Sequence, residues 1–286
     1  MLGHSRQAFY KKKTDGADRL AREIKILDTV REIREMDPGI GGVKLWLMLS
    51  SMYSHGWMPG RDAFLNLLRR NLLMQKPCRT RSTTNSNHRY HKWKNLIKGF
   101  VPTCANQLWV SDITYIDLEG GCCYLHLVTD AYSHKIVGWC LADSLAALFT
   151  LKALRMAIEQ AGGVDLSGLI HHSDRGVQYC CDLYVEELQK HGIRVSMTED
   201  YKPTDNGIAE RVNGIIKGES VYRQTRRFST TEEAREHIRR FIAFYNGKRP
   251  HMSVGNQTPN SVHQQQGVQK KMWKKKIYQK KVEFTN

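Results

Sequence analysis

The sequence predicts an α/β protein with a mixed β-sheet, preceded by a small all-α domain. Three observations support this prediction. Apolar residues recur at three- and four-residue steps within residues 17–70, which is typical of helices. Apolar and polar residues alternate within residues 109–141, which is typical of strands. After residue 144, helical and strand patterns alternate, as in a sheet with helices packed on its faces.

The N-terminal domain, residues 1–75, is expected to contain three helices. The first covers residues 17–36 and ends at Asp37-Pro-Gly39, and the next two cover residues 43–53 and 61–70. The apolar face of the first is expected to consist of Leu20, Ile24, Leu27, Val30, Ile33 and Met36. Short helices joined by a glycine-containing turn indicate either a helix-turn-helix or a helical bundle that only packs on its neighbour. The helix-turn-helix interpretation would bring three basic residues near DNA: Arg61, Arg69 and Arg70.

Residues 76–104 are predicted to form a basic linker. They are rich in Arg, Lys, Ser, Thr and Asn and poor in large apolar side chains, so they cannot bury enough surface to fold alone. Arg89 and Lys92 alternate with aromatic side chains there, a pattern that favours contacts to a nucleic acid.

The larger domain, residues 105–265, has the element order of a ribonuclease-H-like core: three antiparallel strands, then helices alternating with strands. The predicted strands are 109–118, 122–128, 135–141, 169–172 and 193–197. The predicted helices are 144–161, 182–191 and 229–246, and the last begins with a capping box at Ser229-Thr-Thr-Glu-Glu233. The residues expected on or near the core face of the first are Leu145, Leu148, Leu151, Leu154, Met156 and Ile158.

The charge pattern points to a polyanionic partner. The formal net charge is +16, and residues 63–111 hold nine Lys or Arg with no Asp or Glu. The tail, residues 266–286, adds seven lysines and is expected either to clamp DNA or to remain solvated. Clustered positive charge is the electrostatic footprint of a phosphate-binding surface, although a merely soluble basic protein is the alternative.

Other classes of protein are disfavoured. No apolar run approaches a membrane span, and the N-terminus lacks the apolar core of a signal peptide. The seven cysteines form no Cys-x-x-Cys pair, so neither a zinc module nor a disulfide framework is indicated. We therefore expect a cytoplasmic protein with access to DNA and no membrane partner.

Three carboxylates are candidates for the catalytic site. Asp112 lies in the first predicted strand, Asp174 follows the fourth, and Glu210 lies one turn into a helix after the turn at Asp205-Asn-Gly207. Carboxylates that converge repel one another, and Mg²⁺, which prefers oxygen ligands, relieves that repulsion. We expect Asp112 to bridge two ions about 3.5–4 Å apart, with Asp174 and Glu210 completing the two sites. The alternative roles are local capping for the aspartates and a surface position for Glu210, and Asp130 is expected to be structural.

The sequence around these carboxylates resembles the large product of the IS3 family of insertion-sequence transposases, which belong to the DDE type and are similar to retroviral integrases. Between Asp174 and Glu210 lie 35 residues, the interval that gives this family its D,D-35-E description. The matching segments, in order, are Trp109-Val-Ser-Asp-Ile-Thr-Tyr115, His172-Ser-Asp-Arg-Gly-Val-Gln-Tyr179, Asp205-Asn-Gly-Ile-Ala-Glu-Arg211, Lys217 and Tyr245-Asn-Gly-Lys-Arg-Pro-His251.

The resemblance implies a bacterial enzyme that cleaves DNA at the ends of its element and transfers the freed 3′-hydroxyl to target DNA. It implies Mg²⁺ as the cofactor, with Mn²⁺ as a substitute, and double-stranded DNA with terminal inverted repeats as the substrate. A dimer or larger homo-oligomer and a helix-turn-helix and leucine-zipper partner from an upstream reading frame are further expectations. Seven residues are expected near DNA on this basis: Lys217, Arg211, Asn213, Arg175, Lys248, Arg249 and His251.

Two alternatives remain open at this stage. One is a ribonuclease-H-like nuclease that hydrolyses DNA without strand transfer, and the other is a DNA-binding regulator with an idle catalytic site. The intact set of three carboxylates disfavours the regulator. The helix-turn-helix pattern and the motif at residues 245–251 favour the transposase over the nuclease.

Overall fold

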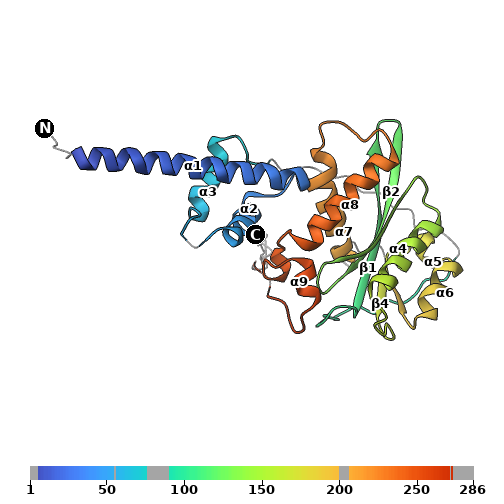
Figure 1. Cartoon of the computed structure of the whole chain (residues 1–286). Coiled ribbons are helices and arrows are strands. Elements are labelled where there is room, and N and C mark those ends of the chain that lie inside the picture. The colour runs from blue at the N-terminus through green and yellow to red at the C-terminus, as the bar shows by residue number, and fades with distance from the viewer. Residues whose placement is uncertain (1–5, 55, 76–89, 200–205, 271, 273–286) are drawn as a thin grey trace, which may run out of the picture.

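The computed structural model describes residues 6–54, 56–75, 90–199, 206–270 and 272. Three N-terminal helices lie to one side of an α/β core, and the predicted fold class is confirmed (Figure 1). None of the helices within these ranges is long and apolar enough to cross a membrane.

The N-terminal helices are α1 (Arg6–Met36), α2 (Gly42–Met52) and α3 (Arg61–Arg70), which confirms the three predicted helices. They share a core that includes Val30, Leu49 and Phe64, each almost fully buried. Among residues 16–36 of α1, whose side chains the structure describes, burial begins at Ile26, where α2 and α3 pack against the helix (Figure 1). Leu20 and Ile24, which were expected on the buried face, are 60% and 51% exposed. The helix-turn-helix interpretation stays a prediction.

Within the described ranges, the sheet has five strands in the order β3-β2-β1-β4-β5. β1 pairs antiparallel with β2 and parallel with β4, β2 pairs antiparallel with β3, and β4 pairs parallel with β5. All five predicted strands are present, with ends shifted by no more than two residues. Their bounds are β1 Leu108–Leu118, β2 Gly121–Asp130, β3 Ile136–Ala142, β4 Ile170–Ser173 and β5 Arg194–Met197.

Helices cover both faces of the sheet, so alternate residues of β1 enter two different cores. On one face, α4 (Ala147–Gln160) and α6 (Asp182–Lys190) pack over Trp109. On the other face, α7 (Gly207–Ile215) and α8 (Thr231–Gly247) pack over Ile116. Because side chains alternate along a strand, Asp112 shares the face of Ile116 and therefore looks toward α7.

Two local predictions can be compared with the helix ends. The capping box of α8 is confirmed, since Thr230 Oγ1 accepts a hydrogen bond from Glu233 N at 3.1 Å and Glu233 in turn accepts one from Ser229 N at 2.7 Å. α4 begins at Ala147 instead of Ser144, and its expected core residues Leu145 and Leu148 are exposed. The short helices α5 (Val177–Cys180) and α9 (Pro259–His263) were not predicted.

The described half of the predicted linker packs against the core. Leu96 N donates to Ser196 Oγ at 2.9 Å, and Trp93 and Ile97 lie against buried residues of the sheet. Residues 90–104 thus obtain from β5 and its surroundings the burial that their own composition lacks. The domain boundaries at residues 75 and 104 stay predictions.

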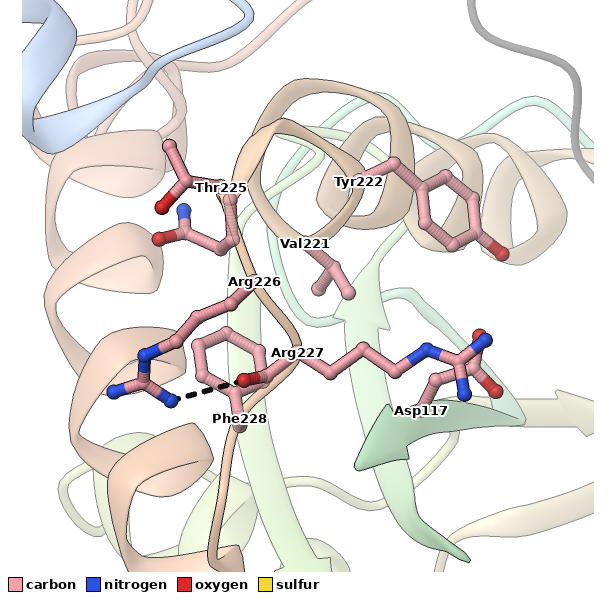
Figure 2. A pocket seen from close by; sticks show the side chains of 8 residues that line it. Asp117, Val221, Tyr222, Thr225, Arg226, Arg227 and Phe228 are labelled. Atoms are coloured by element: carbon pink, nitrogen blue, oxygen red, sulfur yellow. Dashed lines mark hydrogen bonds between the residues drawn. The ribbon is translucent and has the colours of Figure 1, made fainter. Parts of the chain in front are cut away.

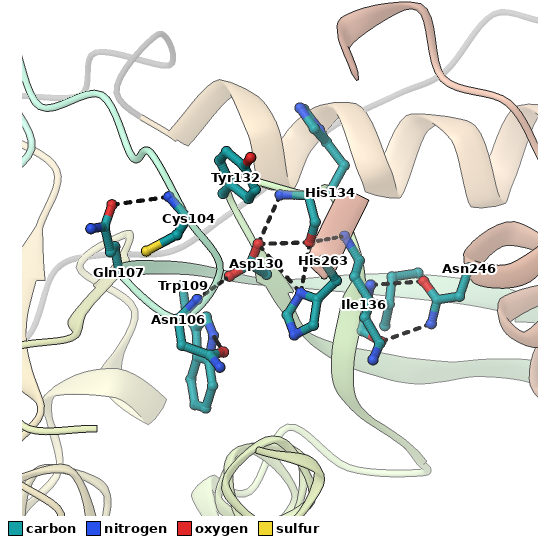
Figure 3. Close-up of polar contacts among 12 residues, drawn as sticks. Cys104, Asn106, Gln107, Trp109, Asp130, Tyr132, His134, Ile136, Asn246 and His263 are labelled. Carbon is teal, nitrogen blue, oxygen red and sulfur yellow. Dashed lines mark hydrogen bonds and ion pairs between the residues drawn. The ribbon is translucent and has the colours of Figure 1, made fainter. Parts of the chain in front are cut away.

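Asp130 has a structural role at the end of β2, as predicted (Figure 3). Its buried carboxylate accepts hydrogen bonds from Ser133 N at 2.8 Å, Ser133 Oγ at 2.7 Å and Asn106 N at 2.8 Å. His263 of α9 approaches within 3.8 Å. Asp130 therefore joins the β2–β3 turn to the segment before β1 and to α9.

A cluster of charged residues joins the N-terminal helices to the core. We call it the interdomain charge cluster, and it consists of Asp37, Lys44, Glu219, Arg249 and His251. Arg249 donates to both carboxylate oxygens of Glu219 at 2.7 Å, and Lys44 Nζ lies 3.0 Å from one of them. Asp37 is fully buried, with Arg249 Nε at 3.8 Å.

The two carboxylates of this cluster divide the available positive charge unequally. Burial alone would raise the pKa of Glu219, but the hydrogen bond and charge of Arg249 lower it to about 2. Burial and the neighbouring charge of Glu219 raise the pKa of Asp37 to about 8, although Arg249 and Lys44 act against the shift. Asp37 is therefore protonated at neutral pH and able to donate to Glu219.

This protonation gives a prediction for Asp37→Asn. Because the folded state holds a proton on Asp37 that the unfolded chain releases near pH 4, wild-type stability from this group falls as the pH rises from about 4 to about 8. The neutral amide of Asn has no such dependence. Relative to wild type, the free energy of unfolding of the variant should therefore rise by up to about 1.4 kcal/mol per pH unit between about pH 4 and about pH 8. Urea unfolding of both proteins at pH 5, 6.5 and 8 measures the difference, and a difference that stays constant with pH contradicts the assignment.

Candidate active site

The register of β1 and β4 brings Asp112 and Asp174 together. The two strands are parallel, and the last registered pair is Val110 with His172. Asp112 and Asp174 each lie two residues beyond that pair, on neighbouring chains about 4.8 Å apart and on the same side of the sheet. β4 ends at Ser173 while β1 continues to Leu118, so the aspartates lie where the sheet loses a neighbouring strand.

The Asp112 carboxylate is held by two hydrogen bonds. Oδ1 accepts from the backbone N–H of Ile113 at 2.9 Å, and Oδ2 accepts from the side-chain amide of Asn213 on α7 at 2.8 Å. Burial raises the pKa of Asp112 to about 7, with further contributions from the charges of Asp174 and Glu210, and the two hydrogen bonds only partly offset this shift. Asp112 therefore lies near two other carboxylates, and neither of its two hydrogen-bond donors carries a positive charge.

Asp174 is held by the turn that follows β4. Its Oδ1 accepts from Gly176 N at 2.9 Å, and a Cβ atom at residue 176 would stand only 2.9 Å from the same oxygen. A larger residue at position 176 would therefore displace the Asp174 carboxylate from this hydrogen bond. Tyr179 of α5 is buried below both aspartates, and burial, followed by their charges, raises its pKa well above the ordinary value.

Glu210 lies in the first turn of α7 and is exposed at the open side of the site. The start of this helix is fixed by Asn206, whose amide donates to the Ser111 carbonyl oxygen at 3.0 Å. Desolvation raises the pKa of Glu210. Of the other two carboxylates, Asp174 raises the pKa of Asp112 more than Glu210 does.

A hard cation suits the donors present, although the carboxylates do not yet enclose one. Across the described ranges, no three Asp, Glu, His or Cys side chains stand close enough to hold a metal ion as placed. The Asp112–Asp174 pair supplies oxygen ligands, and a cation would lower the raised pKa of Asp112 by relieving the repulsion between the two. Within the same described part, Tyr179 Oη and Asn213 Oδ1 are buried beside the pair without a hydrogen-bond partner. These orphaned oxygens fit a site that binds an ion with its water.

Lys217 faces β1 from the helical turn that follows α7. Its side chain is 5% exposed, and its ammonium lies 3.7 Å from the ring centroid of Tyr115. Burial lowers the pKa of Lys217, and the charges of Asp117 and Asp112 act in the opposite direction. Lys217 therefore holds a positive charge over Tyr115 within electrostatic reach of Asp112, and its predicted DNA contact would require it to leave Tyr115.

Three of the residues expected near DNA have other partners. Asn213 is buried and hydrogen-bonded to Asp112. Arg249 and His251 are 2% and 4% exposed and belong to the interdomain charge cluster, so in this structure they lie inside the protein and their DNA contact stays a prediction. A basic motif suggested a surface loop, but the buried carboxylate of Glu219 attracts Arg249 into the protein.

The remaining predicted DNA contacts lie at the surface or outside the described residues. Arg175 is partly exposed beside Asp174, and Arg211 is exposed beside Glu210. Arg89 lies outside the described residues, as does most of the tail from residue 266. The other exposed residues of the predicted set are Arg61, Arg69, Arg70, Lys92 and Lys248.

Sequence reasoning missed the residues that support the carboxylates from a distance. Asn206 was assigned only to a turn, and Glu219 was not singled out at all. A polar residue in the turn before Glu210 was the available signal for Asn206. No local pattern marks Glu219, because its partner Arg249 lies 30 residues away.

A separate pocket of about 380 Å³ lies near the far end of β1 (Figure 2). It is lined by Asp117, Tyr222, Phe228 and the basic residues Arg226 and Arg227, among others. Asp117 is five residues along the strand from Asp112, which corresponds to about 17 Å. The pocket is therefore distinct from the carboxylate site.

Comparison with protein families and relatives agrees with this geometry. Residues 102–203 and residues 191–259 each match a family described as integrase core domain. The chain is 37% identical over 213 residues to the insertion element IS600 31 kDa protein of Shigella sonnei, covering 73% of this chain and 77% of that protein. It is 31% identical over 168 residues to transposase InsF for insertion sequence IS3A of Escherichia coli K12, covering 58% of this chain and 57% of that protein.

A solved structure shares the fold. A chain of the simian T-cell lymphotropic virus intasome, solved in complex with the PP2A regulatory subunit B56 gamma, superposes with a TM-score of 0.50 at 19% identity. The superposition covers 85% of the present chain and 77% of that chain. The similarity therefore extends beyond the sheet.

The contact between Asn213 and Asp112 predicts the effect of Asn213→Ala. Loss of the amide removes a hydrogen bond that favours the charged carboxylate, so the pKa of Asp112 should rise above about 7 in the metal-free protein. Carboxyl ¹³C NMR titration measures the value directly. Arg211→Ala, which changes the exposed neighbour on the same helix, should leave it unchanged, and an equal titration in all three proteins would show that the hydrogen bond is not formed in solution.

Proposed function

Since the chain belongs to the IS3 family of insertion-sequence transposases, which carry a DDE-type integrase core, we propose that Asp112, Asp174 and Glu210 are its catalytic residues. The proposed reaction is cleavage at the ends of the element, followed by attack of the freed 3′-hydroxyl on target DNA. The observation that supports these residues most directly is the parallel register that sets Asp112 beside Asp174, with Glu210 on the helix that binds Asp112 through Asn213.

Mg²⁺ is the proposed cofactor, in two ions and with Mn²⁺ as a substitute. Asp112 and Asp174 would hold the first ion and Asp112 and Glu210 the second, and the unpaired oxygens of Tyr179 and Asn213 lie within the same site. When bound, the ions supply activation of the attacking oxygen and stabilisation of the leaving oxygen. Because Glu210 is exposed at the mouth of the site, it is the ligand that the arriving DNA would meet first.

The chain's own residues prepare this site in three ways. Ile113 N and Asn213 orient the Asp112 carboxylate, so that it keeps one geometry before any ligand arrives. Gly176 orients Asp174 in the same manner. Lys217 contributes a buried positive charge near Asp112, which tempers the repulsion among the carboxylates.

The proposed substrate is double-stranded DNA carrying terminal inverted repeats, together with a target duplex. The net charge of +16 favours such a partner, and Arg211, Arg175 and Lys248 lie at the surface of the core. The exposed arginines of α3 extend the proposed contacts to the N-terminal helices. Action as a dimer or larger homo-oligomer, an upstream-frame partner, and a location in the bacterial cytoplasm complete the proposal.

The main test is DNA cleavage and joining on labelled DNA that carries the element's own ends. Wild type should give Mg²⁺-dependent joined products that EDTA abolishes. Glu210→Gln removes a charged ligand while keeping its shape, so the rate should fall at least about a hundredfold with DNA binding unchanged.

Glu159→Gln, at an exposed position on the opposite face of the sheet, is the matched control and should retain wild-type activity. Cleavage without joining would replace the proposed transposase by a nuclease. Binding without either reaction, even with an upstream partner added, would leave a DNA-binding regulator.

The contribution of Arg211 to DNA binding gives a separate prediction. If Arg211 neutralises one phosphate, Arg211→Gln should reduce the slope of log affinity against log salt by about 0.9 on duplex DNA. Fluorescence anisotropy between 50 and 200 mM salt, a range of about fourfold, measures this slope. Arg155→Gln removes an equally exposed arginine from α4 on the other face and should not alter it.

A further inference from the structure

Glu219 lies at the junction of three parts of the molecule. The helix that carries Glu210 continues through a π-helical turn, Ile216–Ser220, so Glu210 and Glu219 belong to one uninterrupted helical segment. π-helical turns are rare, and they are frequent at functional sites. In this turn, Lys217 faces the carboxylate site while Glu219 faces the N-terminal helices.

We propose that Glu219 is a positioning residue that couples the N-terminal helices to the catalytic helix α7 through Lys44 and Arg249. The expected effect on catalysis rests on the proposed function, but the coupling between the N-terminal helices and α7 does not. It assigns a purpose to Arg249, which was expected to contact DNA.

On the core side, the contact is rigid. Arg249 donates to Glu219 through Nε and Nη2 at 2.7 Å each, a bidentate arrangement, and its side chain is only 2% exposed. Its third nitrogen, Nη1, donates to the His251 ring at 2.9 Å. Burial and the charge of Arg249 lower the pKa of His251, so that ring is neutral and free to accept. The direction of Glu219 is thus set by the segment after α8.

On the side of the N-terminal helices, the contact is close but less deeply buried. Gly39 N donates to the Glu219 carbonyl oxygen at 2.6 Å, and a Cβ atom at residue 39 would stand 2.3 Å from Glu219 Cα. Lys44 reaches Glu219 from α2, and the side chains of these two residues retain 20% and 17% exposure. The Lys44 ion pair can therefore be broken or formed without exposing the Arg249 pair.

The helical segment between these contacts and the carboxylates is fixed at each end. Arg223 Nε donates to the Gly218 carbonyl oxygen at 3.0 Å, and Ser220 Oγ lies 2.6 Å from His237 Nε2 on α8. At the other end, Asn206 binds Ser111 and Asn213 binds Asp112. A displacement of the N-terminal helices that pulls on Glu219 is therefore transmitted along α7 to Asn213 and Asp112.

The cluster is better suited to coupling than to adhesion. Buried ion pairs contribute little net stability, because the loss of hydration offsets their attraction. The apolar contact of Phe244 with the N-terminal core already holds the two parts together. A charged contact made by single residues adds a defined alignment between α2 and α7.

The test compares hydrogen–deuterium exchange in wild type and in Lys44→Met, using the full metal-free chain. Removing Lys44 leaves Glu219 paired with Arg249, so the protein should stay folded. Amide exchange within residues 207–220 should become about five- to tenfold faster, since one anchor of the segment is lost. The DNA-joining rate should fall by a similar factor while DNA affinity stays within about twofold.

Two matched variants decide between outcomes. Lys25→Met removes a lysine from the exposed side of α1 and should leave the exchange of residues 207–220 at the wild-type rate. Lys44→Arg keeps the charge and should restore slow exchange. Equal exchange in Lys44→Met and Lys25→Met, or no rescue by Lys44→Arg, overturns the coupling. If the variants show the expected differences in exchange but the wild-type protein joins no DNA, the proposed function is refuted and the coupling still holds.

Discussion

The parallel pairing of β1 with β4 is the constraint on which the rest of the site depends. Only three residue pairs are in register, from Leu108 to Val110 on β1, and β4 then ends. The next positions on the shared face are the two aspartates, and none of the described segments adds a strand beside β1 there. The other residues of the site surround these aspartates. α7 supplies Asn213 and Glu210, the turn after β4 supplies Gly176, and the turn after α7 supplies the positive charge of Lys217.

The protein treats its buried carboxylates in three different ways. Asp130 is satisfied by N–H and O–H donors and needs no counter-charge. Asp37 accepts a proton, because Arg249 is engaged with Glu219. Asp112 has too few donors for its charge and stands beside a second carboxylate. The charges of Asp130 and Asp37 are thus compensated within the protein, whereas Asp112 keeps a repulsion that a bound cation can relieve. This difference separates the candidate catalytic aspartate from the structural ones.

Local patterns predicted the elements well and the long-range contacts poorly. Alternation along residues 109–141 located β1, β2 and β3, whereas the shared metal site of the three predicted carboxylates stays a prediction. Periodicity identified the apolar face of α1 but not what covers it, so Leu20 and Ile24 were wrongly expected to be buried. The burial of Arg249 depends on Glu219, 30 residues earlier, and on Asp37, from another part of the chain. No pattern near residue 249 contains that information, and its basic neighbours suggested the opposite.

The π-helical turn also limits how such chains can diverge or be recombined. In a regular α-helix each residue adds a rotation of about 100°, so one residue gained or lost between Glu210 and Glu219 would turn one of them away from its partners. The interval of nine positions thus fixes the relative directions of the Glu210 and Glu219 side chains, a phase relation, as well as their separation along the helix. An exchange of N-terminal helices between two relatives would succeed only where both parents keep this phase, whatever their overall similarity. A substitution within this segment keeps that phase, whereas an insertion or deletion changes it.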